Sequence, residues 1–335
     1  MYISFENIQR DFLAQFEKEW TKAVLGLGCN QQQLLLGSRL RPQIVLWGHL
    51  VHDNAEKPIL LADAVNLAVS IELIHKSSLL LDDWIDGDIA RHGESAFHID
   101  YGAPKTVMIA MLMVTESLER LSKIALTVNN HYDCLELLIK TARAMAQGAV
   151  TELSLDETTQ FDYETNRNIA LLETAEIIKN SLLIGYSLTS HEDTELGVIL
   201  TKIGELTGFM FQALNDLESF CESSINAQHK GATNYDFTRF RKNLAVARLY
   251  QLLSVREQEK FANEPTLQNV IKYFEKYKIG RHMLREMEIV FNEVTNLITS
   301  TAKYGASEKW VKGFTSFMLM LRDTAMTRLL EDPVS

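Results

Sequence analysis

The chain has 335 residues, of which 46% are hydrophobic, and this is enough apolar material to bury the core of a large domain. Its net charge of −11 argues against a nucleic-acid partner, because a phosphate backbone needs a basic surface. Five prolines and scarce alternation of apolar and polar residues leave long stretches for helices. We therefore predict an all-α protein folded as a single domain over residues 1–335.

The three cysteines, Cys29, Cys134 and Cys221, lie far apart and show no CxxC spacing. They favour reduced thiols in a cytoplasmic protein over a disulfide framework or a zinc site. The N-terminal residues lack a basic patch followed by an apolar core, so we expect no secretory signal. The densest apolar run, residues 107–114, is too short to cross a bilayer, and we expect no transmembrane segment.

Hydrophobic residues recur three or four positions apart through most of the chain, which predicts a series of helices. In the first helix Phe5, Ile8, Phe12, Phe16 and Trp20 should face the core. Loops are expected at residues 90–95, 101–104 and 222–235, with a loop or short helix at 157–168. The predicted helices cover residues 1–25, a segment beginning at Pro42, then 60–86, 106–124, 134–155, 169–188, 196–220 and roughly the last ninety residues.

The acidic stretch Leu81-Asp82-Asp83-Trp84-Ile85-Asp86 ends the longest predicted helix. Asp82 and Asp86 share a helical face, and Asp83 lies about a quarter-turn away. Three carboxylates this close repel one another unless a cation lies among them, and their hard oxygen atoms suit Mg²⁺. A solvated helix end is the alternative interpretation. The three leucines before Asp82 disfavour it, because they indicate a helix that is buried up to that point.

A second helix carries further oxygen ligands. Asn215, Ser219 and Glu222 lie at i, i+4 and i+7, so they line one face. The loop that follows carries Lys230, and the segment Arg239–Lys242 adds positive charge. We therefore predict a metal site formed by two helices, with cations beside it.

These groups together predict a site for a diphosphate ester. Lys179 lies in the middle of an apolar helix, where an ammonium group is costly to bury without an anion nearby. Mg²⁺ and the cations would hold the diphosphate while apolar walls hold a hydrocarbon tail. The favoured reaction is ionisation of the ester, with a dry pocket that protects the carbocation from water.

From about Leu36 to Ala245 the chain resembles the trans-isoprenyl diphosphate synthases, the polyprenyl synthetases of the class I terpenoid fold. The resemblance implies a bundle of roughly ten or more helices around a central apolar cavity. The motifs that carry it, in the family's order and spacing, are Gly37-Ser38-Arg39-Leu40-Arg41-Pro42 (Gly-Lys-Arg-Leu-Arg-Pro), Glu72–His75 with Leu81–Asp86 (first aspartate-rich helix), Arg91-His92-Gly93 (Arg-Arg-Gly), Gly148 with Glu152 (Gly-Gln-x-x-Asp), Lys179-Asn180 (Lys-Thr), and Phe211-Gln212 with Asn215–Ser219 (second aspartate-rich motif).

The resemblance also implies roles for individual residues, and it implies a homodimer. The residues implied to be catalytic are Asp82, Asp83, Lys179 and Asp216. The residues implied to bind Mg²⁺, three ions by family analogy, are Asp82, Asp83, Asp86, Asn215, Asp216 and Ser219. The residues implied to bind an allylic prenyl diphosphate or isopentenyl diphosphate are Arg41, His75, Arg91, His92, Lys179, Gln212, Lys230 and Lys242, of which Arg41 and His75 belong to the isopentenyl diphosphate site.

Departures from the family pattern leave the function open between three hypotheses. Ser38 stands for a lysine and His92 for an arginine, so the isopentenyl diphosphate site is predicted to be weakened. Asn215 and Ser219 stand for aspartates, which is similar to the metal motif of terpene cyclases. The first hypothesis is a prenyltransferase of the polyprenyl or geranylgeranyl type. The second is a terpene synthase that forms a hydrocarbon or alcohol, and the third is a catalytically silent regulatory subunit of a prenyl synthase.

Overall fold

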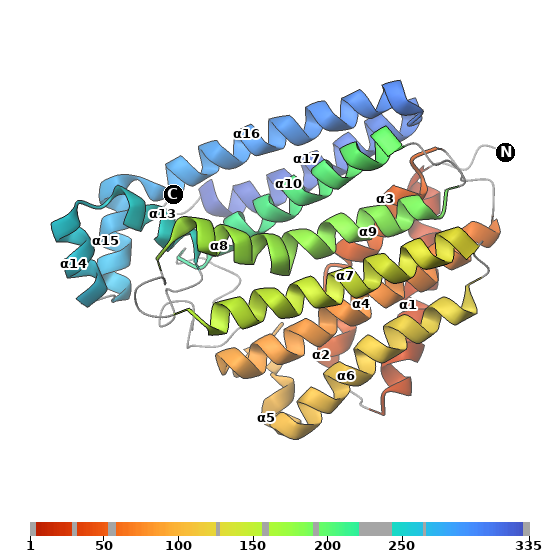
Figure 1. The fold of residues 1–335 in the computed structure, drawn as a ribbon, viewed down its shortest axis with the longest axis horizontal. Coiled ribbons are helices and arrows are strands. Elements are labelled where there is room, and N and C mark those ends of the chain that lie inside the picture. Colours follow the sequence, from red (N-terminus) through yellow and green to blue (C-terminus); the bar gives the residue numbers. More distant parts are fainter. Residues whose placement is uncertain are drawn as a thin grey trace.

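The computed structural model describes residues 5–28, 32–52, 58–124, 128–155, 161–189, 194–220, 243–263 and 266–330. Within these ranges nearly all of the chain is helical, and the helices form the bundle of Figure 1, so the all-α prediction is confirmed. In chain order the elements are α1 (Phe5–Gly26), α2 (Gln32–Leu35), α3 (Leu40–His49), α4 (Pro58–Asp86), β1 (Ala90–Arg91), β2 (Glu94–Ser95), α5 (Phe97–Tyr101), α6 (Ala103–Glu119), η2 (Arg120–Lys123), α7 (Val128–Leu153), α8 (Tyr163–Ala170), η3 (Leu171–Ala175), α9 (Glu176–Ser187), α10 (Thr194–Glu218), α13 (Leu244–Leu252), α14 (Val255–Asn263), α15 (Leu267–Tyr277), α16 (Ile279–Ser300), η5 (Thr301–Tyr304) and α17 (Glu308–Leu330).

The core contains the predicted face of α1 and most of α4. Ile8, Phe12, Phe16 and Trp20 are all buried, which confirms their prediction as core residues. By length and composition alone, the segment Leu61–Asp86 could cross a membrane. However, 72% of its most apolar 18-residue stretch is buried inside the bundle. Its hydropathy is therefore explained by its position as a core helix.

Helix α9 packs against two neighbours at very short distance because glycines remove the side chains in between. A Cβ atom on Gly48 of α3 would lie 2.0 Å from the carbonyl oxygen of Leu182, and one on Gly185 would lie 2.0 Å from that of Val45. On another side, a Cβ atom on Gly204 of α10 would lie 2.4 Å from the Cα of Lys179. Figure 1 shows α9 between α10 and α7, so these glycines fix the centre of the bundle.

The helix predicted to begin at residue 169 begins earlier than expected, and it contains a π-helical turn. The side chain of Asp162 accepts a hydrogen bond of 2.7 Å from the amide of Thr165, so it caps α8 within the segment expected to be a loop or short helix. The helix predicted over residues 169–188 runs on from α8 through η3, a π-helical turn, into α9. Periodicity did not predict the π turn, because it shifts the apolar face by one residue.

The segment expected to be a polar loop at residues 90–95 is instead a short hairpin. Ala90 pairs with Ser95 and Arg91 with Glu94. Both turn residues have positive φ, 55° at His92 and 79° at Gly93, as a two-residue hairpin turn requires. The prediction of a loop over the whole segment was wrong, because only residues 92 and 93 form a turn, and the pairing holds Arg91 on a strand.

Cys134 is buried, and its Sγ lies 3.0 Å from the Oγ of Ser187. Burial raises the pKa of this thiol to about 11, which keeps it protonated at neutral pH. Cys29 and Cys221 lie outside the described residues.

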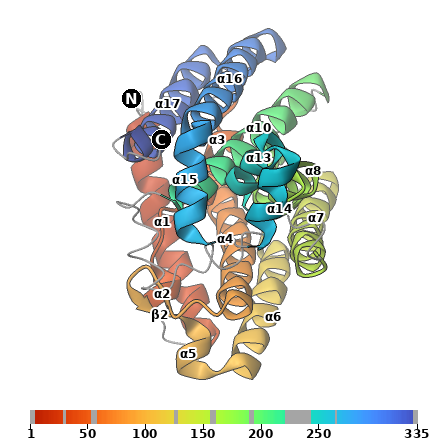
Figure 2. The ribbon, with the colours of Figure 1, turned by 90° about the vertical axis from the view of Figure 1, so that its left-hand side faces the viewer.

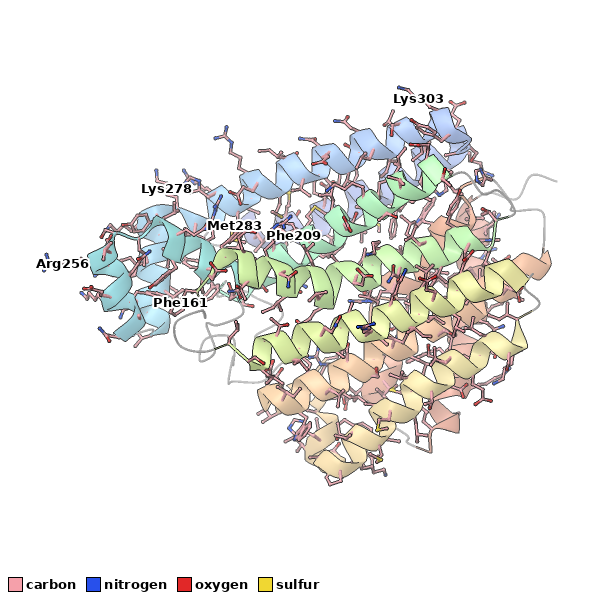
Figure 3. The ribbon with its side chains drawn as sticks, viewed as in Figure 1. Phe161, Phe209, Arg256, Lys278, Met283 and Lys303 are labelled. Atoms are coloured by element: carbon pink, nitrogen blue, oxygen red, sulfur yellow. The ribbon has the colours of Figure 1, made fainter. Side chains whose placement is uncertain are left out.

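Aromatic rings join the C-terminal helices to the rest of the bundle. The ring centroid of Phe161 lies 4.8 Å from that of Tyr250 and 5.5 Å from that of Phe261. Phe261 in turn lies 5.9 Å from Tyr273. Figure 3 shows Phe161 at the end of the molecule formed by α13, α14 and α15, with Arg256 at its outer edge.

Helices α4 and α10 finish at the same end of the molecule, on the left of Figure 1. Both pack against α9. Figure 2 views the molecule from this end and shows β2 beside α2, near the end of α4. The fold therefore brings the acidic end of α4, the polar end of α10 and the hairpin to one end of the bundle.

Candidate active site

The acidic end of α4 is ion-paired with the hairpin. The Nε atom of Arg91 lies 2.6 and 2.8 Å from the two carboxylate oxygens of Asp83, and its Nη2 atom also pairs with Asp83. Gln33 donates a further hydrogen bond of 3.2 Å to Asp83. The Asp82 carboxylate is 3.6 Å from Arg91 Nη2 and 43% exposed, whereas Asp83 is buried. The two adjacent aspartates therefore have different environments.

Burial alone lowers the pKa of Arg91, but hydrogen bonding to Asp83 and the negative charges of Asp83, Asp82 and Asp88 outweigh it and raise the pKa above its ordinary value. The guanidinium thus stays charged beside the carboxylates. Arg91 was expected to bind a diphosphate directly. In this structure its strongest partner is Asp83, and the pair fixes the position of both side chains.

The donor set at the end of α4 fits Mg²⁺ bound together with a diphosphate. Asp82 and Asp86 are four residues apart on one face, and Asp86 is buried. In the described part of the chain no three acidic, histidine or cysteine side chains converge to form a complete metal cage. Mg²⁺ commonly uses one or two carboxylates and fills its other positions with water and substrate phosphate. Asp82 and Asp86 meet that requirement while Asp83 holds Arg91.

The polar residues of α10 form a hydrogen-bonded chain that ends at α13. Gln212 accepts 2.6 Å from Thr174 and donates 2.7 Å to Asp216 Oδ1. Asp216 Oδ2 accepts 2.7 Å from the amide of Leu244, the first residue of α13. Sequence reasoning missed this anchoring role, because Leu244 is 28 residues away and no local motif links the two.

The other two predicted ligands on α10 differ in exposure. Asn215 is exposed. Ser219 is buried and donates 3.1 Å to the carbonyl of Asn215. Of the three side chains predicted as ligands on α10, Asn215 is therefore the one that solvent reaches most easily.

Lys179, in the middle of an apolar helix as predicted, has two carboxylates beside it. Its Nζ atom lies 2.5 Å from Glu176 and 4.0 Å from Glu205. Both glutamates also line a small cavity of about 120 Å³ between η3, α9 and α10. These two glutamates supply the anion that was expected near Lys179. The contact between Lys179 and a diphosphate stays a prediction.

A cluster of basic side chains lies between α3, α4 and the hairpin. Arg39 is buried and pairs with Glu17 at 2.7 Å and with Glu72 at 3.4 Å. The Nε atom of Arg41 is buried and makes no hydrogen bond within the described residues. Burial lowers the pKa of Arg41 to about 10 against the opposing charge of Glu72.

Lys76 belongs to the same cluster and was not predicted from the sequence. It is 3% exposed, and its Nζ atom donates 2.7 Å to the carbonyl of Leu36. Burial lowers its pKa to about 8, against the raising effect of Glu72. A lysine inside an otherwise apolar helix is a signal that could have singled it out, as it did Lys179.

The histidines complete the cluster. Burial lowers the pKa of His75 well below its ordinary value, and the charges of Arg41, Lys76, Arg91 and His92 act in the same direction. His75 is therefore neutral at pH 7. His92 lies in the hairpin turn. Some of the predicted residues lie outside the described residues, namely Glu222, Lys230 and residues 239–242, which include Lys242.

Burial of the Lys76 ammonium gives a pH-dependent stability. Its pKa is 10.5 when solvated and about 8 in the fold. Between these values the unfolded chain binds more protons, so the free energy of unfolding rises with pH, and below pH 8 the full cost, about 3 kcal/mol, is present. From pH 7 to about pH 9.5 the native chain should gain about 2 kcal/mol in the free energy of unfolding as this cost is relieved. Lys76→Met lacks the ammonium and should not show this gain. Urea unfolding of both proteins at both pH values measures this.

The exposed Lys312, paired with Glu308 on α17, provides the control. The stability difference between Lys312→Met and the native chain should be the same at both pH values. A difference for Lys76→Met that is equally constant would contradict the burial of a charged ammonium.

Comparison with known proteins places these motifs in a family. A family model described as polyprenyl synthetase matches residues 29–273. Among curated proteins, the chain is 25% identical over 189 residues to a geranylgeranyl diphosphate synthase of Methanosarcina mazei, covering 54% of each. It is 22% identical over 248 residues to a short chain isoprenyl diphosphate synthase of Methanothermobacter thermautotrophicus, covering 72% of this chain and 73% of the relative. The first of these matches spans only about half the length of the relative.

Solved structures resemble the fold over nearly its whole length. A geranylgeranyl pyrophosphate synthetase from Pyrococcus horikoshii has a TM-score of 0.79 at 16% identity, covering 95% of this chain and 99% of that one. A geranylgeranyl pyrophosphate synthase from Corynebacterium glutamicum has a TM-score of 0.77 at 16% identity, covering 94% and 97%. This likeness confirms the fold expected from the sequence.

Proposed function

Since the chain belongs to the polyprenyl synthetase family, we propose that it is a Mg²⁺-dependent prenyltransferase that joins an allylic prenyl diphosphate to isopentenyl diphosphate. The observation that carries the proposal is the cluster of basic side chains around Arg41 next to the acidic end of α4. Two adjacent sites for diphosphates are what a condensation of two diphosphates needs. The curated relatives described above carry names of such synthases.

In the proposed reaction the bond between the allylic carbon and its diphosphate oxygen breaks first. Asp82 and Asp86 from α4, with Asn215 from α10, would hold Mg²⁺, three ions by family analogy, and the metal supplies neutralising charge for the diphosphate that leaves. Arg91, fixed by Asp83, has its guanidinium 3.6 Å from the Asp82 carboxylate. The apolar side chains packed around α4 would keep water away from the prenyl cation.

The second substrate would lie against α3 and α4. Arg41 would bind its diphosphate, with neutral His75 as a hydrogen-bonding neighbour. The double bond of isopentenyl diphosphate then attacks the prenyl cation, and loss of a proton gives a prenyl diphosphate five carbons longer. The proton is taken by the released diphosphate or by water. Asp83 is a positioning residue in this scheme.

The length of the product follows from the residues before Asp82. Ser77 and Ser78 are small, and Ser78 lies one turn before Asp82 on the same face. A small residue there leaves room for the growing chain beyond the reacting carbon. By family analogy we propose a product of C20 or longer.

A terpene synthase is the second candidate function. The replacement of two aspartates by Asn215 and Ser219 on α10 favours it, because terpene cyclases resemble this chain there. In that reaction no second diphosphate is needed, and the cation is quenched internally or by water. A silent regulatory subunit is a weaker candidate, because Asp82, Asp83 and Asp86 are all retained.

One assay distinguishes these functions. The protein is incubated with Mg²⁺ and geranyl, farnesyl or geranylgeranyl diphosphate, each with and without isopentenyl diphosphate, and the products are identified by mass spectrometry. A longer diphosphate formed only when both substrates are present is the expected result. A hydrocarbon or alcohol formed without isopentenyl diphosphate rejects chain elongation, and no product under any condition favours the silent subunit.

We also propose that the active form is a cytoplasmic homodimer. Large apolar side chains are exposed on the two helices that face the viewer in Figure 1, namely Met108, Met111 and Leu112 of α6 and Ile139, Val150 and Leu153 of α7. An apolar surface of this kind is typical of an interface. Analytical ultracentrifugation should give a mass of twice 38.1 kDa, and a monomer at micromolar concentration would contradict the proposal.

A further inference from the structure

Lys76 is a buried cation that the proposed reaction has not used. Its Nζ atom donates one hydrogen bond, to the carbonyl of Leu36, although an ammonium group has three N–H donors. No carboxylate lies within ion-pair distance of it in the described part of the chain. An ammonium held in this way is costly, and its remaining donors are available to an anion.

The position of the Lys76 ammonium is defined by Gly37. A Cβ atom built on Gly37 would lie 3.3 Å from Lys76 Nζ and 3.4 Å from Arg39 Nη1, so the ammonium lies against the backbone of the turn formed by residues 37–39, which precedes α3. The next residue, Ser38, is exposed and has no charge. In the family pattern, position 38 supplies a lysine to this turn. In this chain the lysine beside the turn comes from α4 instead.

The carboxylates nearest to Lys76 are already paired with other cations. Arg39 is paired with Glu17 and Glu72, and Arg91 is paired with Asp83. Arg41 and Lys76 have no ion pair within the described residues, and Glu72 is the carboxylate whose charge acts on both. Arg41 and Lys76 therefore share one carboxylate, and that carboxylate is already bonded to Arg39. Two neighbouring cations in this position are suited to a doubly charged ligand.

We propose that Lys76 binds the diphosphate of the second substrate together with Arg41, and so replaces the cation missing at Ser38. This inference rests on the proposed function, because it identifies the ligand as isopentenyl diphosphate. The departure at Ser38 is then a relocation of charge from the turn to the neighbouring helix. Affinity for the second substrate is retained, in contrast to the weakened site expected from the sequence.

The test is a comparison of Michaelis constants for the two substrates. Removing the cation in Lys76→Met should raise KM for isopentenyl diphosphate about 10- to 100-fold, as expected for one charge-assisted hydrogen bond. KM for the allylic diphosphate should change less than about twofold. Lys76→Arg, which keeps the charge, should show a smaller increase. Equal changes in both constants, or none in either, would overturn the proposal.

A relocation variant separates a binding role from a structural one. The double variant Lys76→Thr with Ser38→Lys returns the cation to the turn and should recover KM for isopentenyl diphosphate to within about tenfold of the native value. Loss of a merely structural lysine would not be rescued from position 38. The exposed pair of α17 gives the control Lys312→Met, which should leave both constants unchanged. Circular dichroism establishes that every variant is folded.

Direct binding keeps this inference separate from the proposed function. Isothermal titration with isopentenyl diphosphate alone requires no turnover. If the native chain binds it and Lys76→Met binds it at least about tenfold more weakly, Lys76 is a diphosphate ligand even if no elongated product forms. If the native chain elongates a prenyl diphosphate and Lys76→Met binds isopentenyl diphosphate with native affinity, the role of Lys76 is wrong while the proposed function stands.

Discussion

Substituting Asp82 with alanine should lower kcat for the consumption of an allylic diphosphate by about 10³-fold or more. Asp82 shares a face with Asp86 and would hold Mg²⁺ where negative charge develops on the leaving group, and such electrostatic contributions are worth several kcal/mol. Its carboxylate is 43% exposed, so its removal should leave the thermal stability nearly unchanged. Steady-state turnover and thermal unfolding, measured on the same preparation, test both expectations.

Asp83 provides the informative comparison. Asp83→Asn breaks a buried ion pair with Arg91, and we expect it to lower the free energy of unfolding by about 3 kcal/mol or more as well as reducing turnover. Asp11→Ala, at an exposed site on α1, is the control for loss of a surface carboxylate. Near-native turnover in Asp82→Ala would show that this residue is no metal ligand.

Gly48→Ala should be strongly destabilising, as should Gly185→Ala, because a Cβ atom at either position would lie 2.0 Å from a backbone carbonyl oxygen. In Gly48→Ala the new Cβ atom would lie 2.0 Å from the carbonyl oxygen of Leu182 and 2.9 Å from the amide nitrogen of Tyr186. These are backbone atoms of α9, so neither can move without shifting a helix. We expect a loss of about 3–5 kcal/mol in the free energy of unfolding, measured by urea denaturation.

Gly26→Ala is the matched control, because a Cβ atom there meets nothing within 4 Å. Alanine has the higher helix propensity, so this variant should be neutral or stabilised by up to about 1 kcal/mol. Helix α3 carries Arg41 and α9 carries Lys179, so the crossing also sets the distance between two site helices. Equal stability of Gly48→Ala and the native chain would contradict the close crossing.

Much of the fold was predictable because helical periodicity is a local property. The aromatic residues of α1 repeat every three or four positions, and the burial of Phe12, Phe16 and Trp20 followed from that spacing. The same reasoning placed Asp82 and Asp86 on one face of α4. Short polar segments were less predictable. The hairpin at Arg91 depends on two residues with positive φ, and only Gly93 of the two is typical of such a turn.

The partners of the site residues were not predictable, because they depend on contacts between distant segments. Asp83 was expected to be a metal ligand equivalent to Asp82, yet the hairpin brings Arg91 against it. Lys76 gave a recognisable signal as a lysine in an apolar helix, but the neighbours of its ammonium depend on the packing of Gly37 against α4. Spacing identifies candidate residues, but their partners, such as Arg91 for Asp83, depend on the tertiary fold.

A crystal structure with Mg²⁺, isopentenyl diphosphate and an allylic thiolodiphosphate that cannot ionise would test the central claim most directly. We predict the allylic diphosphate between the acidic end of α4 and the polar end of α10, reached from one side by Asp82 and Asp86 and from the other by Asn215, with the second diphosphate on Arg41 and Lys76. A headgroup bound by only one of the two helices, or Asp82 and Asn215 too far apart to share it, would contradict the account.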